Sequence, residues 1–370
     1  MPQTVIVIGL GCAGSAACAC LTSRGASVIG LEQFKVGHER GSSAHQSRAF
    51  RMAYAEHPGY VPLLKRSREL WLMINEGYSQ TVFHQTGGLY LSNSETGFVP
   101  DSIAAATAHN VPHDVLTADQ VRSRFPVFNI PDEFIGLHEP LAGFIVPEHA
   151  IAAHIAVARN DDADLREGVN VLGWKETASG IEVETDQGTV AGDALVICKG
   201  AWTNEVPIRP SRQVMVWFDS PANAGVDAPK LPVWALELED GAVLYGFPRA
   251  SGLPGPDGFK VARHIAGDTV DPNDETAKAV VEGDEMDVLP HLQRWLPSAV
   301  GEVTAVRSCM YANSPDGHFQ IGLHPECERV VIIAGLSGHG FKFQPVIGEI
   351  AADLALDGEC DLDISFLGLK

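Results

Sequence analysis

The sequence predicts an α/β protein with two domains, and three observations support this fold class. Its 370 residues exceed the usual size of a single domain. The first 35 residues contain a strand pattern, a glycine-rich turn, an Ala-rich helical segment and a second strand pattern. Between about residues 210 and 300, short alternating apolar runs are separated by Pro and Gly, which predicts an antiparallel sheet. We therefore expect a βαβ unit and a second domain rich in antiparallel strands.

The N-terminal βαβ unit can be predicted element by element. The β-rich run at residues 4–8 indicates a first strand. Residues 15–24 are Ala-rich and helical, and Gly25 is suited to end that helix. Residues 27–31 indicate a second strand that ends at Glu32, and the polar segment 33–47 is expected to be a loop.

Periodicity and proline positions predict the later elements. Apolar residues at helical spacing predict a helix over 61–74, and Pro147 favours the start of a helix over 148–159. A second glycine loop at 335–340 precedes a final helix at 345–356. Strands are expected at 87–91, 169–172, 181–185, 194–198, 213–218, 243–247, 259–263 and 330–334. Segments 1–80, 150–210 and 305–370 are expected to form one discontinuous domain, and segments 81–149 and 211–304 the other.

Composition excludes several classes of partner. The 47 Asp and Glu against 26 Lys and Arg give a formal net charge of −21, which argues against nucleic acid or an anionic membrane surface as partner. No apolar run of about 18 residues predicts a membrane span, and the N-terminus lacks the pattern of a signal peptide. The seven cysteines include no CxxC pair, so we expect no disulfide framework, no metal site and a cytoplasmic location.

The segment Gly9-Leu10-Gly11-Cys12-Ala13-Gly14 is a GxGxxG motif between a strand and a helix. Gly9 allows the tight turn, Gly11 lets the backbone approach a pyrophosphate, and Gly14 allows the helix to pack on the strand. Glu32 lies 18 residues after Gly14, where an acid can bind a ribose diol and favours FAD or NAD over NADP. A glycine-rich core turn is the alternative.

Three further features are ambiguous on local sequence alone. Arg48 and Arg51 are three apart and are predicted on one face of a helix, where a solvated pair is the usual alternative. The loop Gly338-His339-Gly340-Phe341-Lys342 could place a ligand ring against backbone amides, although Lys342 could also be a surface lysine. Cys309 reads as an ordinary buried cysteine.

Taken in order along the chain, six motifs are recognisable as a set. Together they resemble the monomeric sarcosine oxidase / N-methyltryptophan oxidase family of FAD-dependent amine oxidases, over nearly the whole chain. The resemblance implies a two-domain flavoprotein with a Rossmann-like FAD domain and an antiparallel-sheet substrate domain. The motifs are Gly9–Gly14, Gly41-Ser42-Ser43 with Arg48 and Arg51, Gly200-Ala201-Trp202, Tyr245-Gly246-Phe247-Pro248, Cys309-Met310-Tyr311 and Gly338-His339-Gly340-Phe341-Lys342-Phe343.

The resemblance also implies roles for individual residues. Cys309 matches a cysteine that joins the flavin covalently, and Arg51 and Lys342 match two cations that hold the substrate carboxylate. Lys260, which promotes oxygen reduction, Arg48, which stacks at the flavin, and the pocket histidine His264 are the implied catalytic residues. Tyr245, Tyr311 and Ala235 are implied to line the substrate pocket, and Glu56 matches an acid present in relatives. The implied cofactor-binding residues are Gly9, Gly11, Gly14, Glu32, Ser42, Ser43, Arg48, Cys309, Gly338, Gly340, Phe341 and Lys342.

Two departures from the family pattern bear on the substrate. Ala44 stands where sarcosine oxidases have a histidine, with His45 one place later, and Ala235 stands where they have a pocket methionine. Both changes are expected to enlarge or reshape the pocket. A bulkier N-alkyl amino acid or a cyclic imino acid is therefore the expected substrate, in preference to sarcosine.

The implied activity is oxidation of a secondary amine to an imine, which hydrolyses to an aldehyde and an amine, while O₂ is reduced to H₂O₂. The expected partners are a small amino-acid-like substrate and O₂, and the protein is expected to be a monomer. Three alternatives remain open at this point. They are an FAD-dependent amine dehydrogenase that passes electrons to a carrier, a non-catalytic flavin- or NAD-binding protein, and a nicotinamide dehydrogenase.

Overall fold

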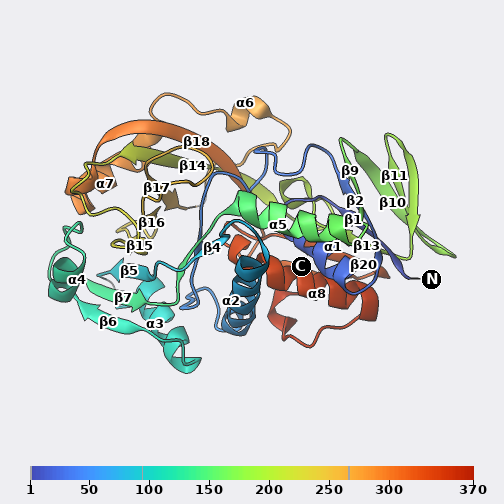
Figure 1. Ribbon diagram of the computed structural model, residues 1–370, viewed down its shortest axis with the longest axis horizontal. Helices are drawn as coiled ribbons and strands as arrows, with labels where there is room; N and C mark the ends of the chain where they lie inside the picture. Colours follow the sequence, from blue (N-terminus) through green and yellow to red (C-terminus); the bar gives the residue numbers. More distant parts are fainter. Residues whose placement is uncertain (1, 94, 266) are drawn as a thin grey trace.

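The computed structural model describes residues 2–93, 95–265 and 267–370, and the chain forms two groups of sheets (Figure 1). One group is built on strand β1, whose residues Val5, Ile6 and Val7 are completely buried. A strand buried on both faces is typical of the centre of a parallel sheet. Within the described residues, this six-stranded sheet has the order β19 (Gln320–His324), β20 (Cys327–Ala334), β13 (Ala194–Ile197), β1 (Thr4–Ile8), β2 (Ser27–Glu32) and β9 (Asp164–Glu167), with β19 antiparallel to β20 and the other pairs parallel.

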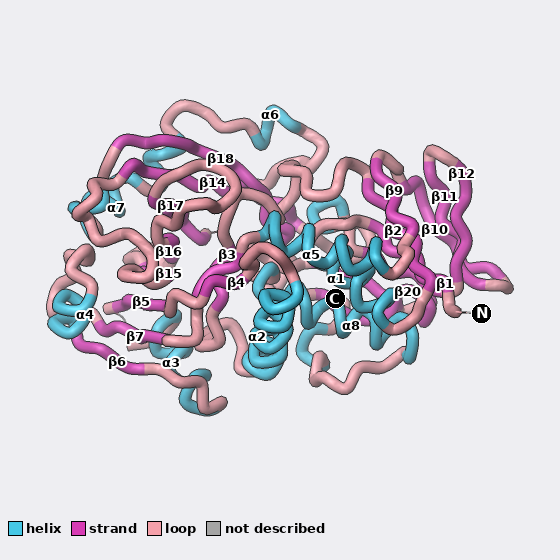
Figure 2. The backbone as a smooth tube through the Cα atoms, viewed as in Figure 1, coloured by secondary structure: helices cyan, strands magenta, loops and turns pink. Residues whose placement is uncertain are grey.

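The two faces of this sheet are covered differently, because successive side chains of a strand point to opposite faces. Val5 and Val7 pack in one cluster with residues of α1 (Cys12–Ser23), α5 (Pro147–Asn160) and α8 (Gln344–Asp357). Ile6 and Ile8 pack in another cluster with the ribbon of β10 (Val171–Thr177), β11 (Gly180–Thr185) and β12 (Gly188–Gly192). Figure 2 shows this ribbon beside the N-terminus.

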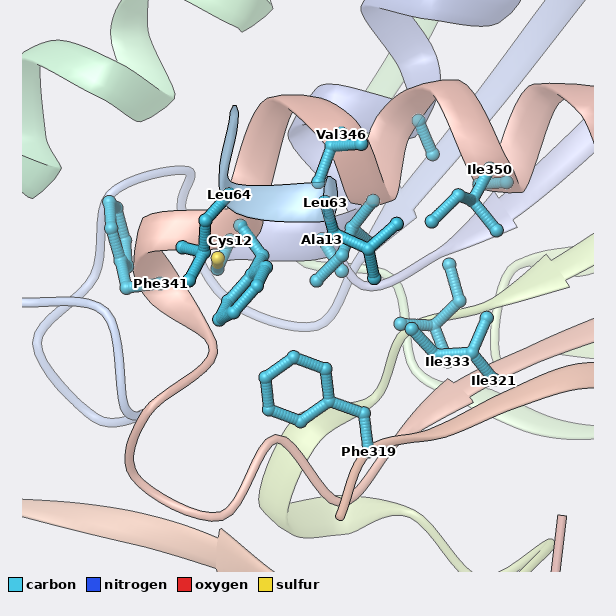
Figure 3. Close-up of a cluster of buried hydrophobic side chains, with 14 of the residues drawn as sticks. Cys12, Ala13, Leu63, Leu64, Phe319, Ile321, Ile333, Phe341, Val346 and Ile350 are labelled. Carbon is cyan, nitrogen blue, oxygen red and sulfur yellow. The ribbon is translucent and has the colours of Figure 1, made fainter. Parts of the chain in front are cut away.

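The helical side of the sheet contains the main core. Helix α2 (Tyr60–Gly77) and α8 bring apolar side chains against α1. Figure 3 shows Leu63 and Leu64 from α2, Val346 and Ile350 from α8, and Cys12 and Ala13 from α1 together with Phe319, Ile321, Ile333 and Phe341. This core holds the glycine turn that precedes α1 in a fixed position against the sheet.

The second group is a large sheet of mainly antiparallel strands, to the left in Figure 1. Within the described residues its order is β18 (Glu302–Asn313), β14 (Arg209–Asp219), β17 (Phe259–His264), β16 (Val243–Phe247), β15 (Val233–Glu237), β5 (Gly88–Ser92), β7 (Ile135–Glu139) and β6 (Asp114–Thr117). Strands β15 and β5 pair in parallel. The helices of this part are α3 (Phe98–Ala108), α4 (Ala118–Arg124), α6 (Glu275–Lys278) and α7 (Leu289–Trp295).

A small third sheet lies between the two groups. It contains β3 (Arg48–Phe50), β8 (Gly143–Ile145) and β4 (Phe83–His84). Short 3₁₀ turns complete the described elements: η1 (Gly200–Trp202), η2 (Asp284–Asp287), η3 (Pro297–Ala299), η4 (Phe341–Phe343) and η5 (Ser365–Leu367). No helix in the described part of the chain is long and apolar enough to cross a membrane.

The α/β fold class and most predicted elements are confirmed, with shifted ends. The helix predicted around Arg48 and Arg51 is wrong, because Arg48 belongs to β3 and pairs antiparallel with Ile145. A partner almost a hundred residues away decides this local conformation. Strand β14 is longer than predicted, Cys198 lies just outside β13, and the parallel pair β15–β5 was not expected. The predicted domain boundaries stay a prediction, although β18 crosses residue 305 and pairs along its length with β14.

The contact between α1 and α8 allows a test of this packing. A Cβ at Gly348 in α8 would lie 2.7 Å from the backbone oxygen of Ala16 in α1. We expect Gly348→Ala to lower the free energy of unfolding by about 1–3 kcal/mol, the usual cost of overpacking, measured by urea unfolding. The control is Gly77→Ala at the end of α2, where a Cβ would meet no atom within 4 Å. Equal stability of both variants would contradict the close packing.

Candidate functional site

The glycine turn between β1 and α1 is sterically restricted. Gly9 has φ = 85°, and a Cβ there would lie 2.5 Å from the carbonyl oxygen of Cys198. A Cβ at Gly14 would lie 1.7 Å from the carbonyl oxygen of Gly9, so helix and strand touch at this point. The N-cap residue Gly11 has no side chain, and the amide of Cys12 donates to Ser43 Oγ at 3.3 Å. The first turn of α1 therefore offers amides and a positive dipole end to an anion.

A cavity of about 680 Å³ opens in front of this turn. Glu32 lines it, with Oε2 accepting from the amide of Leu10 at 2.8 Å and Oε1 from the amide of Phe34 at 2.9 Å. Its carboxylate thereby fixes the backbone on either side. Of the twelve predicted cofactor-binding residues, nine line this cavity: Gly9, Gly11, Glu32, Ser42, Ser43, Arg48, Gly338, Gly340 and Phe341. Gly14 packs behind the turn, and Cys309 and Lys342 line the neighbouring cavity.

A second, smaller cavity of about 150 Å³ adjoins the first. Arg48, Tyr311, Gly338 and Phe341 line both cavities. Gly338 is required there, because a Cβ at this residue would lie 2.4 Å from the ring of Tyr311. The other residues lining the second cavity are Ala49, Arg51, Glu56, Tyr90, Phe98, Gln213, Met215, Val233, Trp234, Ala235, Val243, Tyr245, Phe247, His264, Cys309, His339 and Lys342.

The register of the large sheet determines one wall of the second cavity. Ala235 pairs with Tyr245, Tyr245 with Ala262, and Ala262 with Met215, which forms one row across β15, β16, β17 and β14. Lys260 lies two residues from Ala262 on the same face and pairs with Phe247 and Trp217. Lys260 lines neither cavity and is 2% exposed, one row further along this face of the sheet.

Arg51 is a partly buried cation at the second cavity. Its guanidinium donates to Glu56 Oε1 at 2.5 Å and to the carbonyl of Ala53 at 3.0 Å. The guanidinium also lies 4.2 Å from the ring centre of Tyr54, a cation–π distance. Burial alone would raise the pKa of Glu56, but the positive charge of Arg51 and its neighbours lowers that pKa to about 2. The carboxylate therefore stays charged and keeps Arg51 oriented.

Lys342 is the second cation of this cavity, at 6% exposed. Its Nζ donates to the carbonyl of His339 at 2.7 Å and lies 3.5 Å from the hydroxyl of Tyr54. Burial, followed by the charge of Arg51, lowers the pKa of Lys342 to about 7. This cation can therefore lose its proton near neutral pH.

His339 fixes the tyrosine that contacts both cations. The carbonyl of Gly317 can only accept, so His339 Nε2 donates to it at 2.9 Å and Nδ1 accepts from Tyr54 Oη at 2.6 Å. Burial lowers the pKa of His339 to about 3, which keeps the ring neutral. His264 is likewise neutral, because burial lowers its pKa to about 4, and its Nδ1 lies 3.0 Å from Tyr311 Oη.

Arg48 and Lys260 are held by backbone carbonyls. Arg48 donates to the carbonyls of Ser42, Ala44 and Ser47 at 2.9, 2.5 and 2.9 Å. Lys260 Nζ donates to the carbonyls of His45 and Ser47 at 2.6 and 3.0 Å. Carbonyl oxygens can solvate a positive charge on these side chains without neutralising it, while burial and the charge of Arg48 hold the pKa of Lys260 well below its usual value.

The structure brings most predicted site residues together. Arg48, Arg51, Ala235, Tyr245, Tyr311, His264, Cys309 and Lys342 all line the second cavity. Burial raises the pKa of the Cys309 thiol, although Arg48 and Lys260 oppose this. Ala44 is buried in the loop and lines neither cavity, and the reshaping of the pocket expected from this position stays a prediction.

Sequence reasoning missed several residues that line the second cavity or contact the side chains around it. Phe98 and Gln213 reach the second cavity from elements far apart in the chain, and no local pattern marks them. Tyr54 and His339 each lie three residues from a predicted cation, Arg51 and Lys342, which is the one signal that could have found them. The contacts of Gln46 and Glu148 also had no sequence signal.

Comparisons with known proteins are consistent with this geometry. Residues 4–354 match the family described as FAD dependent oxidoreductase. The chain is 40% identical over 364 residues to a monomeric sarcosine oxidase of Streptomyces avermitilis, covering 96% of this chain and 94% of that protein. It is 30% identical over 377 residues to an N-methyl-L-tryptophan oxidase of Yersinia pestis, covering 100% and 99%.

Solved structures share the fold over the whole chain. NikD, described as an unusual amino acid oxidase essential for nikkomycin biosynthesis, has a TM-score of 0.84 at 24% identity and covers 100% of this chain and 98% of its own. An L-proline dehydrogenase from P. horikoshii has a TM-score of 0.82 at 22% identity and covers 100% and 97%. At this level of identity the likeness establishes the fold.

The pKa of Lys342 predicts how anion binding depends on pH. Between pH 6 and 9, Arg51 stays charged, Glu56 stays anionic and His339 stays neutral, so Lys342 is the group of this cluster that titrates. An anion favours the ammonium, so acetate affinity should fall as pH rises through about 7, approaching tenfold per pH unit. Isothermal calorimetry on the wild type and on Lys342→Met measures the acetate affinity at each pH. The variant should bind about ten- to a hundredfold more weakly at pH 6, with a flat profile; a flat wild-type profile would contradict the assignment.

Proposed function

The chain belongs to the family of FAD dependent oxidoreductases, and from this premise we propose that it oxidises secondary amines that bear a carboxylate, with O₂ as electron acceptor. One observation supports the proposal above the others. Two basic side chains, the partly buried Arg51 and the buried Lys342, lie at one small cavity that adjoins a larger cavity with a dinucleotide-type glycine turn. This arrangement supports carboxylate recognition next to a cofactor site.

The larger cavity fits the family's cofactor, FAD. Gly9 and Gly14 allow a close turn that a Cβ would prevent, and the bare N-terminus of α1 faces the cavity. The volume of about 680 Å³ is in the range of cofactor sites. We assign the pyrophosphate to the α1 turn, a ribose to Glu32, and the flavin ring to the region that both cavities share. Bound there, FAD supplies the acceptor for the electrons of the C–H bond next to the substrate nitrogen.

Arg51 and Lys342 orient the substrate by its carboxylate. Each charge-assisted contact contributes about 1.5–3 kcal/mol. Two contacts on one carboxylate restrict where the carbon atom next to it lies, so the reacting C–H bond is held in one orientation. The same cations disfavour an ammonium nearby, so the amine binds in its neutral form. The apolar wall of Phe98, Val243 and Phe247 keeps water from the reacting carbon.

The size of the cavity narrows the substrate class. A cavity of about 150 Å³ is comparable to one that holds benzene. Ala235 gives this space a small side chain at its centre row, between Tyr245 and Tyr90, to which it is paired. We therefore propose a cyclic imino acid, such as proline or pipecolate, as a better substrate than N-methyltryptophan. Sarcosine would leave part of the apolar space unfilled.

Lys260 is proposed to assist the reduction of O₂. Its side chain lies on the cavity face of the sheet, one row from Met215 and Tyr245. A fixed cation there would stabilise the negative charge that develops on oxygen. A dehydrogenase that uses an electron carrier would not need this charge, and the rate of reoxidation by O₂ separates the two enzymes.

The proposed substrate class is tested with a panel of sarcosine, proline, pipecolate, N-methyltryptophan and a fructosyl amino acid, with detection of peroxide. We expect the highest kcat/KM for proline or pipecolate. Prolinamide, which lacks the carboxylate, should lose about ten- to a hundredfold in kcat/KM relative to proline. If sarcosine is best, the size argument is wrong; flavin bleaching without peroxide would indicate a dehydrogenase, and no bleaching by any amine would contradict an amine-oxidising enzyme.

Covalent attachment of the flavin through Cys309 is a separate proposal. Cys309 lies in β18 opposite Gln213 and lines the second cavity, beside the region shared by both cavities. After acid precipitation the wild type should keep its yellow colour in the pellet, and Cys309→Ser should release it to the supernatant. Cys198→Ser is the matched control, because Cys198 lines the larger cavity and should leave the colour in the pellet. Yellow colour in the wild-type supernatant would mean a non-covalent flavin.

A further inference from the structure

We propose that Gln46 is a positioning residue for Lys260, because its side chain holds the turn His45–Ser47 in the conformation that directs two carbonyls onto the lysine. The inference rests on the proposed role of Lys260 in oxygen reduction. Gln46 lines neither cavity, so it would act through the turn and not by touching substrate or cofactor. The test below separates the two proposals.

The backbone of this turn is unusual. His45 and Gln46 have φ values of 75° and 73°, in the left-handed region that non-glycine residues disfavour. Two such residues in succession persist only where the surroundings enforce them. Both residues are nearly fully buried, at 6% and 5% exposed. Something other than local preference therefore holds the turn.

Gln46 supplies contacts to three separate elements. Its Nε2 donates to the carbonyl of Pro256 at 2.9 Å, and its Oε1 accepts from Trp217 Nε1 in β14 at 2.6 Å. Its backbone amide donates to Glu148 Oε1, in the first turn of α5, at 3.0 Å. Both ends of the side-chain amide and the main-chain amide are thus fixed.

His45 closes the turn from the other side. Its ring Nε2 donates at 3.1 Å to the carbonyl of Ser308, the residue before Cys309. Burial lowers the pKa of His45 to about 4, so the ring is a neutral donor. The turn is therefore tied to the strand that contains the proposed flavin attachment site.

The result is a cradle of acceptors around one ammonium. The carbonyls of His45 and Ser47 lie 2.6 and 3.0 Å from Lys260 Nζ, and Ser47 Oγ lies at 3.3 Å. Three acceptors match the three N–H donors of an ammonium. The ring of Trp217, whose N–H binds Gln46, lies 5.2 Å from Nζ. Gln46 thus contacts both the turn and an aromatic ring beside the cation.

The charges that face Lys260 show why the cradle matters. Burial is the main cause that lowers the pKa of Lys260, and the positive charge of Arg48 in β3 lowers it further. Cys309 in β18 and Glu148 in α5 act in the opposite direction and raise this pKa. The neutral ring of His45 adds no charge. Glu148 acts through the same turn, since it accepts from the amide of Gln46. If the turn relaxes, the ammonium loses carbonyl partners while Arg48 stays close, so the neutral amine becomes favoured.

The test measures reoxidation without any amine substrate. Holoenzyme is reduced anaerobically with stoichiometric dithionite and mixed with air-saturated buffer from pH 6 to 10 in a stopped-flow instrument. Gln46→Leu should slow reoxidation about tenfold at pH 8 and move the alkaline fall of the rate about one unit to lower pH. Gln46→Asn, which keeps an amide and tolerates the left-handed region, should show a smaller shift and keeps the test usable if Gln46→Leu does not fold.

Two further variants complete the design. Lys260→Met should reoxidise slowly, and its reoxidation rate should no longer fall as the pH becomes alkaline. Gln320→Leu is the matched control, because Gln320 is also a buried glutamine with both amide ends bonded, to the carbonyl of Pro207 and the amide of Lys370. It should keep the wild-type rate and pH profile.

The outcomes separate the two proposals. If Lys260→Met slows reoxidation and the Gln46 variants keep the wild-type pH profile, the positioning role is overturned and the oxygen role of Lys260 stands. A control that shifts the profile as much as Gln46→Leu would also overturn it, because the effect would then be general destabilisation. If Lys260→Met reoxidises at the wild-type rate, the oxygen role is wrong and the inference falls with it.

Discussion

The loop from Ser42 to Ser47 accepts hydrogen bonds from the side chains of Arg48 and Lys260 with its own backbone carbonyls, and the site is organised around this interaction. The carbonyl of Ser47 accepts from both Arg48 and Lys260, at 2.9 and 3.0 Å. A buried charge without partners would be very costly, and a carboxylate partner would cancel the charge. Carbonyl dipoles avoid both results, at the cost of two left-handed residues of about 1–3 kcal/mol each. The conformation of the loop therefore determines the electrostatics beside the two cavities, and neither can change without the other.

Arg51 and Lys342, the two cations of the proposed carboxylate site, are likewise brought together from distant segments. The short strand β3 leads directly to Arg51, and Glu139 in β7 fixes the next residues by accepting from the amides of Met52 and Ala53. Lys342 comes from the other end of the chain, through the turn η4 before α8. Neither segment alone contains both cations of the second cavity, so their proposed joint role depends on how the two parts of the chain pack together.

The net charge of the chain and the charge of its interior have opposite signs. The formal net charge is −21, yet Arg48, Arg51, Lys260 and Lys342 converge near two adjoining cavities. Local desolvated charges act more strongly than distant exposed ones, which solvent and salt screen. A small anion is therefore compatible with this protein, while a polyanion would meet the acidic surface first.

Local sequence by itself determined the βαβ unit, the glycine turn and most strands, because tight turns and periodic burial leave a signature within a few residues. The motif resemblance also gave the family and most residues of the second cavity. Tertiary structure alone decided that Arg48 lies in a strand, since its partner Ile145 is remote. It also decided that Ala44 is outside the cavity and that Gln46 adopts a left-handed conformation. These outcomes depend on hydrogen bonds and register between distant segments, which no local pattern of residues encodes.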